Sequence, residues 1–243
     1  MMPEVRPHAL IFGASSGIGA ALALRLAGSH AVTALARRMD RLGALATGNA
    51  AIHPGVCDVA VAQTIQPAIE AAVTARGPID LMVYCAGLQS IRPLRTTKRD
   101  EIDRVITVNL TAAVQVASHF ASPRLTTDDA LFCIISSIAA QRPEPGIIPY
   151  AVAKAGLEAL VKGVAREAAP RRAVAIAPGW LDTEMTQGQP RVYTPEFREK
   201  LVGSTPRGIV TVDQVVDLIM FLARPESGAI TGQTITIDGG ASL

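Results

Sequence analysis

Residues 10–28, LIFGASSGIGAALALRLAG, set three glycines between a short apolar run and an apolar segment of helical length. Gly13, Gly17 and Gly19 permit a tight turn and let the backbone come close to a bound phosphate. The following helix would offer free N–H groups and the positive end of its dipole to that anion. Because the spacing directly follows an apolar run, we interpret it as a dinucleotide-binding turn rather than a purely structural one.

Short apolar runs alternate with longer amphipathic stretches from one end of the chain to the other. The runs are HALIF, AVTALA, AAIHPGV, IDLMVYCAG, ALFCIIS, AVAIAPG and QTITIDGG. Several are apolar almost throughout, as strands buried on both faces are. This rhythm predicts an α/β fold: a three-layer, doubly wound Rossmann arrangement with a mainly parallel seven-stranded sheet. At 243 residues, the chain fits one domain spanning positions 1–243.

Composition narrows the classes of partner. The net charge is +2 and the charges are scattered, which argues against nucleic acid or a membrane as the main partner. Cys57, Cys85 and Cys133 are odd in number and lie in apolar runs, which is typical of reduced, buried thiols in a cytoplasmic protein. The four histidines lack metal-ligand spacing, so we expect no metal site. The uncharged stretch 9–24 is short and rich in glycine, so we predict no targeting segment.

The end of the second apolar run bears on the choice of cofactor. An acid near Ala36 would be expected for a free ribose 2′-hydroxyl, but Arg37 and Arg38 follow instead. Guanidinium groups fork onto a 2′-phosphate, so the chemistry favours NADP, with NAD still possible. At least Arg37 is expected to bind that phosphate. The alternative is that one or both arginines are solvated at the start of the next helix.

A tyrosine and a lysine stand four residues apart in IPYAVAKAGL, residues 148–157. On an α-helix, that spacing puts Tyr150 and Lys154 on nearly the same face. An ammonium beside a phenol favours phenolate, so such a tyrosine could exchange a proton near neutral pH. The run FCIISSIAA brings Ser136 or Ser137 to the same edge of the sheet, where a hydroxyl can bind a carbonyl oxygen. Alone, each of these residues is more often structural than functional.

Taken in order, these motifs resemble the short-chain dehydrogenase/reductases in their compact form, and in particular the ketoreductases similar to 3-oxoacyl-carrier-protein reductase. The resemblance spans essentially the whole chain. It rests on GASSGIG, CDV at 57–59, CAG at 85–87, VNL at 108–110, Ser137, the Tyr150 and Lys154 pair, PGWLDTEM at 178–185 and ITGQTITIDGG near the end.

The resemblance implies a role for each matching residue. Tyr150 would be the general acid and Ser137, chosen over Ser136 by the family's interval to the tyrosine, would polarise the carbonyl. Lys154 would hold the nicotinamide ribose and lower the pKa of Tyr150, and Asn109 would shape its helix and hold a relay water. The implied cofactor contacts are Gly13, Ser15, Ser16, Gly17, Ile18, Gly19, Arg37, Arg38, Asp58, Val59, Ala86, Gly87, Tyr150, Lys154, Pro178, Gly179, Leu181 and Thr183. A homotetramer or homodimer is also implied.

The chain departs from the family pattern at Phe12, Tyr84 and Cys85, where the family has a threonine and two asparagines. The family's hydrogen bond between the first and fourth strands would be lost at both ends together. We therefore expect Phe12 to pack near Tyr84 or Cys85 as an apolar substitute. The segment APRRAVAIAPG, residues 169–179, is also about two residues shorter than the family's run.

Two proline-rich segments, 142–149 and 180–211, are predicted to be loops or lids, because prolines such as Pro190, Pro195 and Pro206 prevent a continuous helix. We interpret positions 180–207 as a substrate lid. Its side chains would suit a medium-sized, anionic ketone, although half of them could equally face solvent. They are Trp180, Met185, Tyr193 and Phe197 beside Arg191, Arg198, Lys200 and Arg207.

The favoured function is NADPH-dependent reduction of a ketone to a secondary alcohol. An NAD(P)-dependent dehydrogenase oxidising a secondary alcohol is the main alternative, and a non-catalytic dinucleotide-binding regulator is a third. The basic segment IRPLRTTKR, residues 91–99, leaves open a thioester substrate on acyl carrier protein or coenzyme A, although a solvated helix start explains the same charges.

Overall fold

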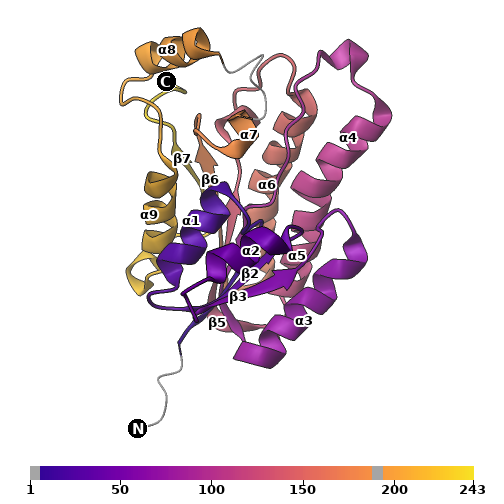
Figure 1. Ribbon diagram of the computed structural model, residues 1–243, viewed down its shortest axis with the longest axis vertical. Helices are drawn as coiled ribbons and strands as arrows, with labels where there is room; N and C mark the ends of the chain where they lie inside the picture. Colours follow the sequence, from indigo (N-terminus) through magenta and orange to yellow (C-terminus); the bar gives the residue numbers. More distant parts are fainter. Residues whose placement is uncertain (1–5, 188–193) are drawn as a thin grey trace.

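The computed structural model describes residues 6–187 and 194–243 (Figure 1). Seven parallel strands form one sheet in the order β3-β2-β1-β4-β5-β6-β7, which confirms the predicted fold class. Each of the seven apolar runs holds one strand. The strands are β1 (His8–Phe12), β2 (Ala31–Ala36), β3 (Ile52–Val56), β4 (Ile79–Tyr84), β5 (Thr126–Ile135), β6 (Arg172–Pro178) and β7 (Thr234–Ile237).

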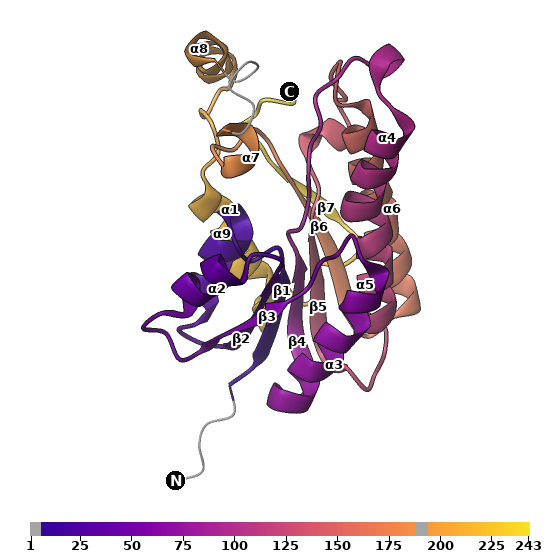
Figure 2. The ribbon, with the colours of Figure 1, turned by 45° about the vertical axis from the view of Figure 1, so that its right-hand side comes forward.

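Helices cover both faces of the sheet (Figure 2). The alternating residues of β1 separate the two cores: Ile11 packs with α1 (Gly17–Leu26), α2 (Met39–Ala46) and α9 (Val212–Leu222), whereas Leu10 packs with the opposite layer. That layer contains α3 (Ile65–Arg76), α5 (Ala112–Phe120) and α6 (Ile148–Glu167), with α4 (Arg99–Ile106) against α6. Burial on both faces is why the central strands β1 and β4 are apolar almost throughout.

The expected contact between Phe12 and Tyr84 is confirmed. The two residues pair across β1 and β4, and their ring centroids lie 6.0 Å apart at an interplanar angle of 36°. Both side chains are buried, and the Tyr84 hydroxyl donates to the Val108 carbonyl at 2.6 Å. Burial raises the pKa of Tyr84, so the phenol stays protonated. Aromatic packing thus joins the two strands where the family pattern has polar side chains.

The two proline-rich segments contain more helix than the sequence predicts. Helix α6 begins at Ile148, inside the predicted loop 142–149, and the predicted lid carries α7 (Glu184–Gln187) and α8 (Pro195–Ser204). Pro195 is in the first turn of α8, where a proline costs no hydrogen bond, so a short helix begins there although the segment forms no continuous helix. Three residues named for the lid, Pro190, Arg191 and Tyr193, lie outside the described residues.

Candidate active site

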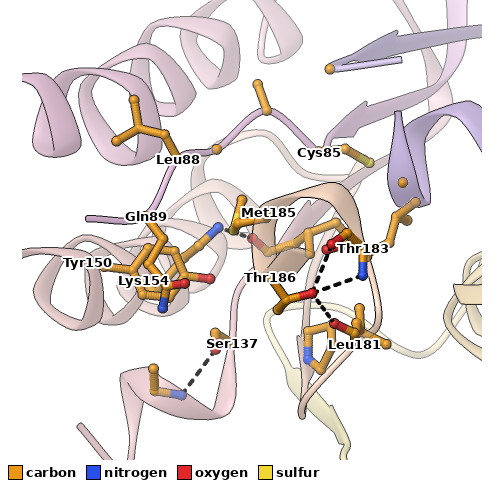
Figure 3. A pocket seen from close by; sticks show the side chains of 18 of the residues that line it. Cys85, Leu88, Gln89, Ser137, Tyr150, Lys154, Leu181, Thr183, Met185 and Thr186 are labelled. Atoms are coloured by element: carbon orange, nitrogen blue, oxygen red, sulfur yellow. Dashed lines mark hydrogen bonds between the residues drawn. The ribbon is translucent and has the colours of Figure 1, made fainter. Parts of the chain in front are cut away.

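A cleft of about 790 Å³ opens beyond the carboxyl ends of the strands, where ligands bind in doubly wound sheets (Figure 3). It is lined by the glycine turn, the ends of β2, β4 and β5, the start of α6, and α7. Every residue predicted to contact the cofactor lines it, as does Ser137. Asn109 is the one predicted site residue that does not.

The glycine turn has the geometry of a phosphate cradle. Gly13 has φ +84°, and a Cβ there would lie 2.6 Å from the Ala86 nitrogen. A Cβ on Gly19 would lie 2.4 Å from the Gly13 carbonyl oxygen. Only glycine fits positions packed this closely. Ser16 caps α1 without a side-chain hydrogen bond to the helix, so the first-turn N–H groups face the cleft without that partner. These features fit a dinucleotide diphosphate.

Arg38, rather than Arg37, is held against the glycine turn. Its Nη2 donates to the Ser15 and Ser16 hydroxyls at 3.0 Å each, and its Nε donates to Ser15 at 3.3 Å. Arg37 also lines the cleft but is exposed, and it forms no ion pair with any described residue. An anion at the end of β2 would therefore meet one guanidinium already fixed in place and two serine hydroxyls.

Tyr150 and Lys154 project from the first two turns of α6 into the cleft. The ammonium of Lys154 lies 5.4 Å from the centre of the Tyr150 ring, and it donates to the Ile135 carbonyl at 2.7 Å. Lys154 is only 4% exposed, and this burial lowers its pKa to about 8. The predicted pair is thus brought together, with a cation that titrates close to neutral pH.

The two serines at the end of β5 have different surroundings. The hydroxyl of Ser136 is buried and donates to the Lys154 carbonyl at 3.1 Å, so it ties β5 to α6. Ser137 lines the cleft, and its oxygen accepts from the Ala139 nitrogen at 3.2 Å. That bond leaves the Ser137 hydroxyl hydrogen available to a ligand oxygen. The geometry favours Ser137 as the residue that meets a substrate.

Asn109 lies behind the cleft, in a π-helical turn (Thr107–Thr111) between α4 and α5. Its side chain is fully buried; Nδ2 donates to the Leu88 and Val105 carbonyls, and Oδ1 accepts from the Leu88 nitrogen. A Cβ on Gly87 would lie 2.9 Å from Oδ1. Asn109 therefore fixes the loop after β4, which carries Ala86 and Gly87. Its role in holding a water stays a prediction.

The segment that carries α7 lies beside the glycine turn. A Cβ on Gly17 would lie 3.8 Å from the Thr183 methyl group, which is ordinary van der Waals contact. The Thr186 hydroxyl accepts from the Thr183 nitrogen and donates to the Leu181 and Thr183 carbonyls, so it shapes this segment. Thr186 was not predicted from the sequence, and neither were the lining residues Gln89, Arg104, Arg142 and Glu144. Gln89, Arg142 and Glu144 lie in irregular segments, where no periodic pattern marks them, whereas Thr186 lies in the short helix α7 and Arg104 in α4.

Residues 6–187 and 194–243 contain no group of three His, Cys, Asp or Glu side chains able to hold a metal ion. Within the same residues, no helix is both long and apolar enough to cross a membrane.

Comparison with known proteins identifies the family. A family model described as enoyl-(acyl carrier protein) reductase matches residues 13–242. The short-chain reductase protein NovJ of Streptomyces niveus is 32% identical over 96% of this chain and 92% of its own length. The chain belongs to the short-chain dehydrogenase/reductase family.

Further relatives agree with this assignment. The 3-oxoacyl-[acyl-carrier-protein] reductase FabG of Thermotoga maritima is 33% identical, over 95% of this chain and 96% of its own. A solved short-chain dehydrogenase/reductase from Serratia marcescens superposes with a TM-score of 0.89 at 30% identity, covering 98% of this chain and 99% of that chain. The protein is therefore an oxidoreductase of a family that uses NAD or NADP.

Proposed function

We propose that this short-chain dehydrogenase/reductase is an NADPH-dependent enzyme that reduces a ketone to a secondary alcohol. The observation that carries the proposal is the meeting of Ser137, Tyr150 and Lys154 in the cleft that also holds the glycine turn. Each residue alone has a structural explanation. Together they provide a hydroxyl donor, a proton donor and a cation beside a phosphate cradle.

The choice of NADPH over NADH rests on the end of β2. The position after Ala36 holds no carboxylate for a ribose diol, and Arg38 is fixed beside the Ser15 and Ser16 hydroxyls. A guanidinium and two hydroxyls suit a phosphate monoester. When bound, NADPH would supply the hydride, delivered from its nicotinamide to the carbonyl carbon.

The side chains of the cleft would orient the substrate and supply the proton. Ser137 would donate its hydroxyl hydrogen to the substrate oxygen, polarising the carbonyl and fixing its orientation. Tyr150 would then donate its phenol proton to that oxygen. The ammonium of Lys154 favours the resulting phenolate, so it would stabilise the charge left on Tyr150. Met185 and Thr186, from α7, line the same cleft and would help to exclude water.

Oxidation of a secondary alcohol is the same chemistry run backwards, with Tyr150 accepting the proton. The arginines favour reduction only through the choice of cofactor. A 3-oxoacyl thioester is the second candidate substrate, because the relative from Thermotoga maritima is named for that reaction. In the basic segment, Arg92 and Arg99 are paired with Glu101 and Asp103, which leaves Arg95 and Lys98 exposed to an acidic carrier.

We also propose a homo-oligomer. Val114 on α5 and Val152 on α6 are 46% and 57% exposed, although both helices bury their other faces in the core. Exposed β-branched side chains on two neighbouring helices suit an interface between copies. Sedimentation of the wild type and of the double variant Val114→Glu, Val152→Glu tests this: we expect the variant to be monomeric, and a monomeric wild type would contradict the proposal.

The proposed function is tested by NADPH oxidation with a panel of ketones and a 3-oxoacyl thioester, comparing the wild type with Tyr150→Phe. The variant keeps the ring but cannot donate a proton, so we expect a loss in kcat of about 10²-fold to 10⁴-fold. Its affinity for NADPH should stay within about threefold of the wild type. Unchanged turnover in Tyr150→Phe would refute the acid role, and a wild type that turns over only alcohols would favour the dehydrogenase.

A further inference from the structure

A carboxylate of the lid is bound by two arginines on the other side of the cleft. Glu184 is the first residue of α7, and its Oε2 lies 3.2 Å from Nη1 of Arg38. Its other oxygen accepts a hydrogen bond from Arg41. Arg38 caps the N-terminus of α2 and Arg41 lies in its first turn, 146 and 143 residues away in sequence. No pattern in the sequence indicates this contact or marks Arg41.

Glu184 is the anionic partner of Arg38 among the described residues. The other groups bonded to that guanidinium are the neutral hydroxyls of Ser15 and Ser16. The hydrogen bonds from Arg41 and Arg38 hold the pKa of Glu184 below its usual range, so the carboxylate is charged at neutral pH. Arg38, Arg41 and the two hydroxyls thus form an anion site that the protein's own carboxylate fills.

The contact also positions the lid. Thr183, the residue before Glu184, faces the glycine turn, since a Cβ built on Gly17 would lie 3.8 Å from its methyl group. The ion pairs therefore hold the start of α7 over the phosphate cradle. Both pairs are about half exposed, with 40% and 42% of the arginine side chains and 50% of the glutamate accessible. Exposed pairs of this kind are weak and easily exchanged.

We propose that Glu184 is a specificity-determining latch: its carboxylate competes with the 2′-phosphate of NADPH for Arg38 and Arg41, and only a 2′-phosphorylated cofactor displaces it. The inference rests on the proposed function, since it assumes that these arginines receive the 2′-phosphate. A phosphate monoester carries roughly −1.5 to −2 charge at pH 7 against −1 for the carboxylate, and it offers three oxygens. NADH has no group to take the place of Glu184, so it would bind with the latch still closed.

The first test compares Glu184→Gln with the wild type by fluorescence titration of NADPH and NADH at low ionic strength. Glutamine keeps the size of the side chain but removes the competing charge. NADPH should bind about threefold to fivefold more tightly, as loss of two exposed ion pairs allows, and NADH should change by less than about twofold. Glu199→Gln is the matched control, because Glu199 is exposed on α8 and forms no hydrogen bond or ion pair within the described residues. Its affinities should equal those of the wild type.

A second readout follows the lid itself. Trp180, the single tryptophan, stands four residues before Glu184. It packs edge-to-face on Phe197 of α8, with ring centroids 5.2 Å apart. Adenosine 2′,5′-bisphosphate should change the Trp180 emission of the wild type, whereas 5′-AMP should not. In Glu184→Gln the bisphosphate should cause a much smaller change, because the latch is already open.

The outcomes separate the latch from the proposed function. Equal NADPH affinity in Glu184→Gln and the wild type would overturn the latch. Weaker binding of both cofactors to Glu184→Gln would also overturn it, because the carboxylate would then be a cofactor contact. The preference of the wild type for NADPH over NADH is a separate measurement, and its absence would refute the cofactor choice while leaving the comparison with Glu184→Gln valid.

Discussion

Replacing Lys154 by methionine is expected to stabilise the cofactor-free protein at neutral pH and to have almost no effect at pH 10. The ammonium is 4% exposed, with the Ile135 carbonyl 2.7 Å away. Burial lowers the pKa of Lys154 from 10.5 to about 8. Between pH 8 and pH 10.5, Lys154 is therefore protonated in the unfolded chain but largely neutral in the folded chain. Below pH 8 the folded state must keep the buried ammonium charged, and this destabilises it.

The magnitude follows from the shift. A difference from 10.5 to about 8 costs the folded state about 3 kcal/mol below pH 8, and most of this cost disappears between pH 7 and pH 10. The free energy of unfolding of the wild type therefore rises with pH between pH 7 and pH 10. Methionine also forfeits the bond to the Ile135 carbonyl, about 1 kcal/mol at any pH. We thus expect Lys154→Met to be about 2 kcal/mol more stable than the wild type at pH 7 and roughly equal at pH 10.

Urea unfolding of both proteins at pH 7 and pH 10, at one protein concentration, measures this difference. Titrating groups distant from Lys154 cancel in the comparison, and the buried Cys85 thiol, with its pKa raised to about 12, stays protonated throughout. Lys162→Met, an exposed lysine on the same helix, controls for the loss of one charge. A stability difference for Lys154→Met that is the same at both pH values would refute the reasoning, as would an equal pH dependence in Lys162→Met.

Three further predictions concern single contacts. Gly13→Ala should destabilise the protein by about 2 to 4 kcal/mol and abolish tight NADPH binding, because of its positive φ and its backbone contact with the loop after β4; a normal melting temperature would contradict this. Ser137→Ala should lower kcat about 10²-fold without changing the melting temperature, whereas Ser136→Ala should cost about 1 kcal/mol of stability with nearly normal turnover; the reverse result would exchange their roles. Tyr84→Phe should cost about 1 to 3 kcal/mol in urea unfolding, because a backbone carbonyl loses its 2.6 Å hydrogen bond; no loss would show that the bond is dispensable.

The sheet was predictable because buried parallel strands leave an unmistakable apolar signal. The contact between Phe12 and Tyr84 was predictable too. Both residues replace polar residues of the family pattern that join the first and fourth strands, so a change at one end implies a matching change at the other. The helix at Pro195 was not predicted, because proline excludes a helix interior but suits a first turn, and the sequence alone does not say which applies.

The candidate site likewise contains features that the sequence predicted and features that it did not. Local spacing was enough to place Tyr150 beside Lys154, because both belong to one helix. The sequence favoured Arg37 as the phosphate ligand, whereas the structure holds Arg38 against the glycine turn. The direction of a side chain at the start of a helix depends on what packs around it. The contact between Glu184 and α2 joins segments more than 140 residues apart, and no local pattern records such a contact.

The central claim is that Arg38 and its serine neighbours select a 2′-phosphorylated cofactor for the cleft that holds Tyr150. The most direct test is fluorescence titration of NADPH and NADH with the wild type, Arg38→Ala and Arg37→Ala. We expect the wild type to prefer NADPH by tenfold or more, about 1.4 kcal/mol, and this preference to collapse in Arg38→Ala but not in Arg37→Ala. Equal affinity of the wild type for both cofactors, or a preference unchanged in Arg38→Ala, would contradict the account.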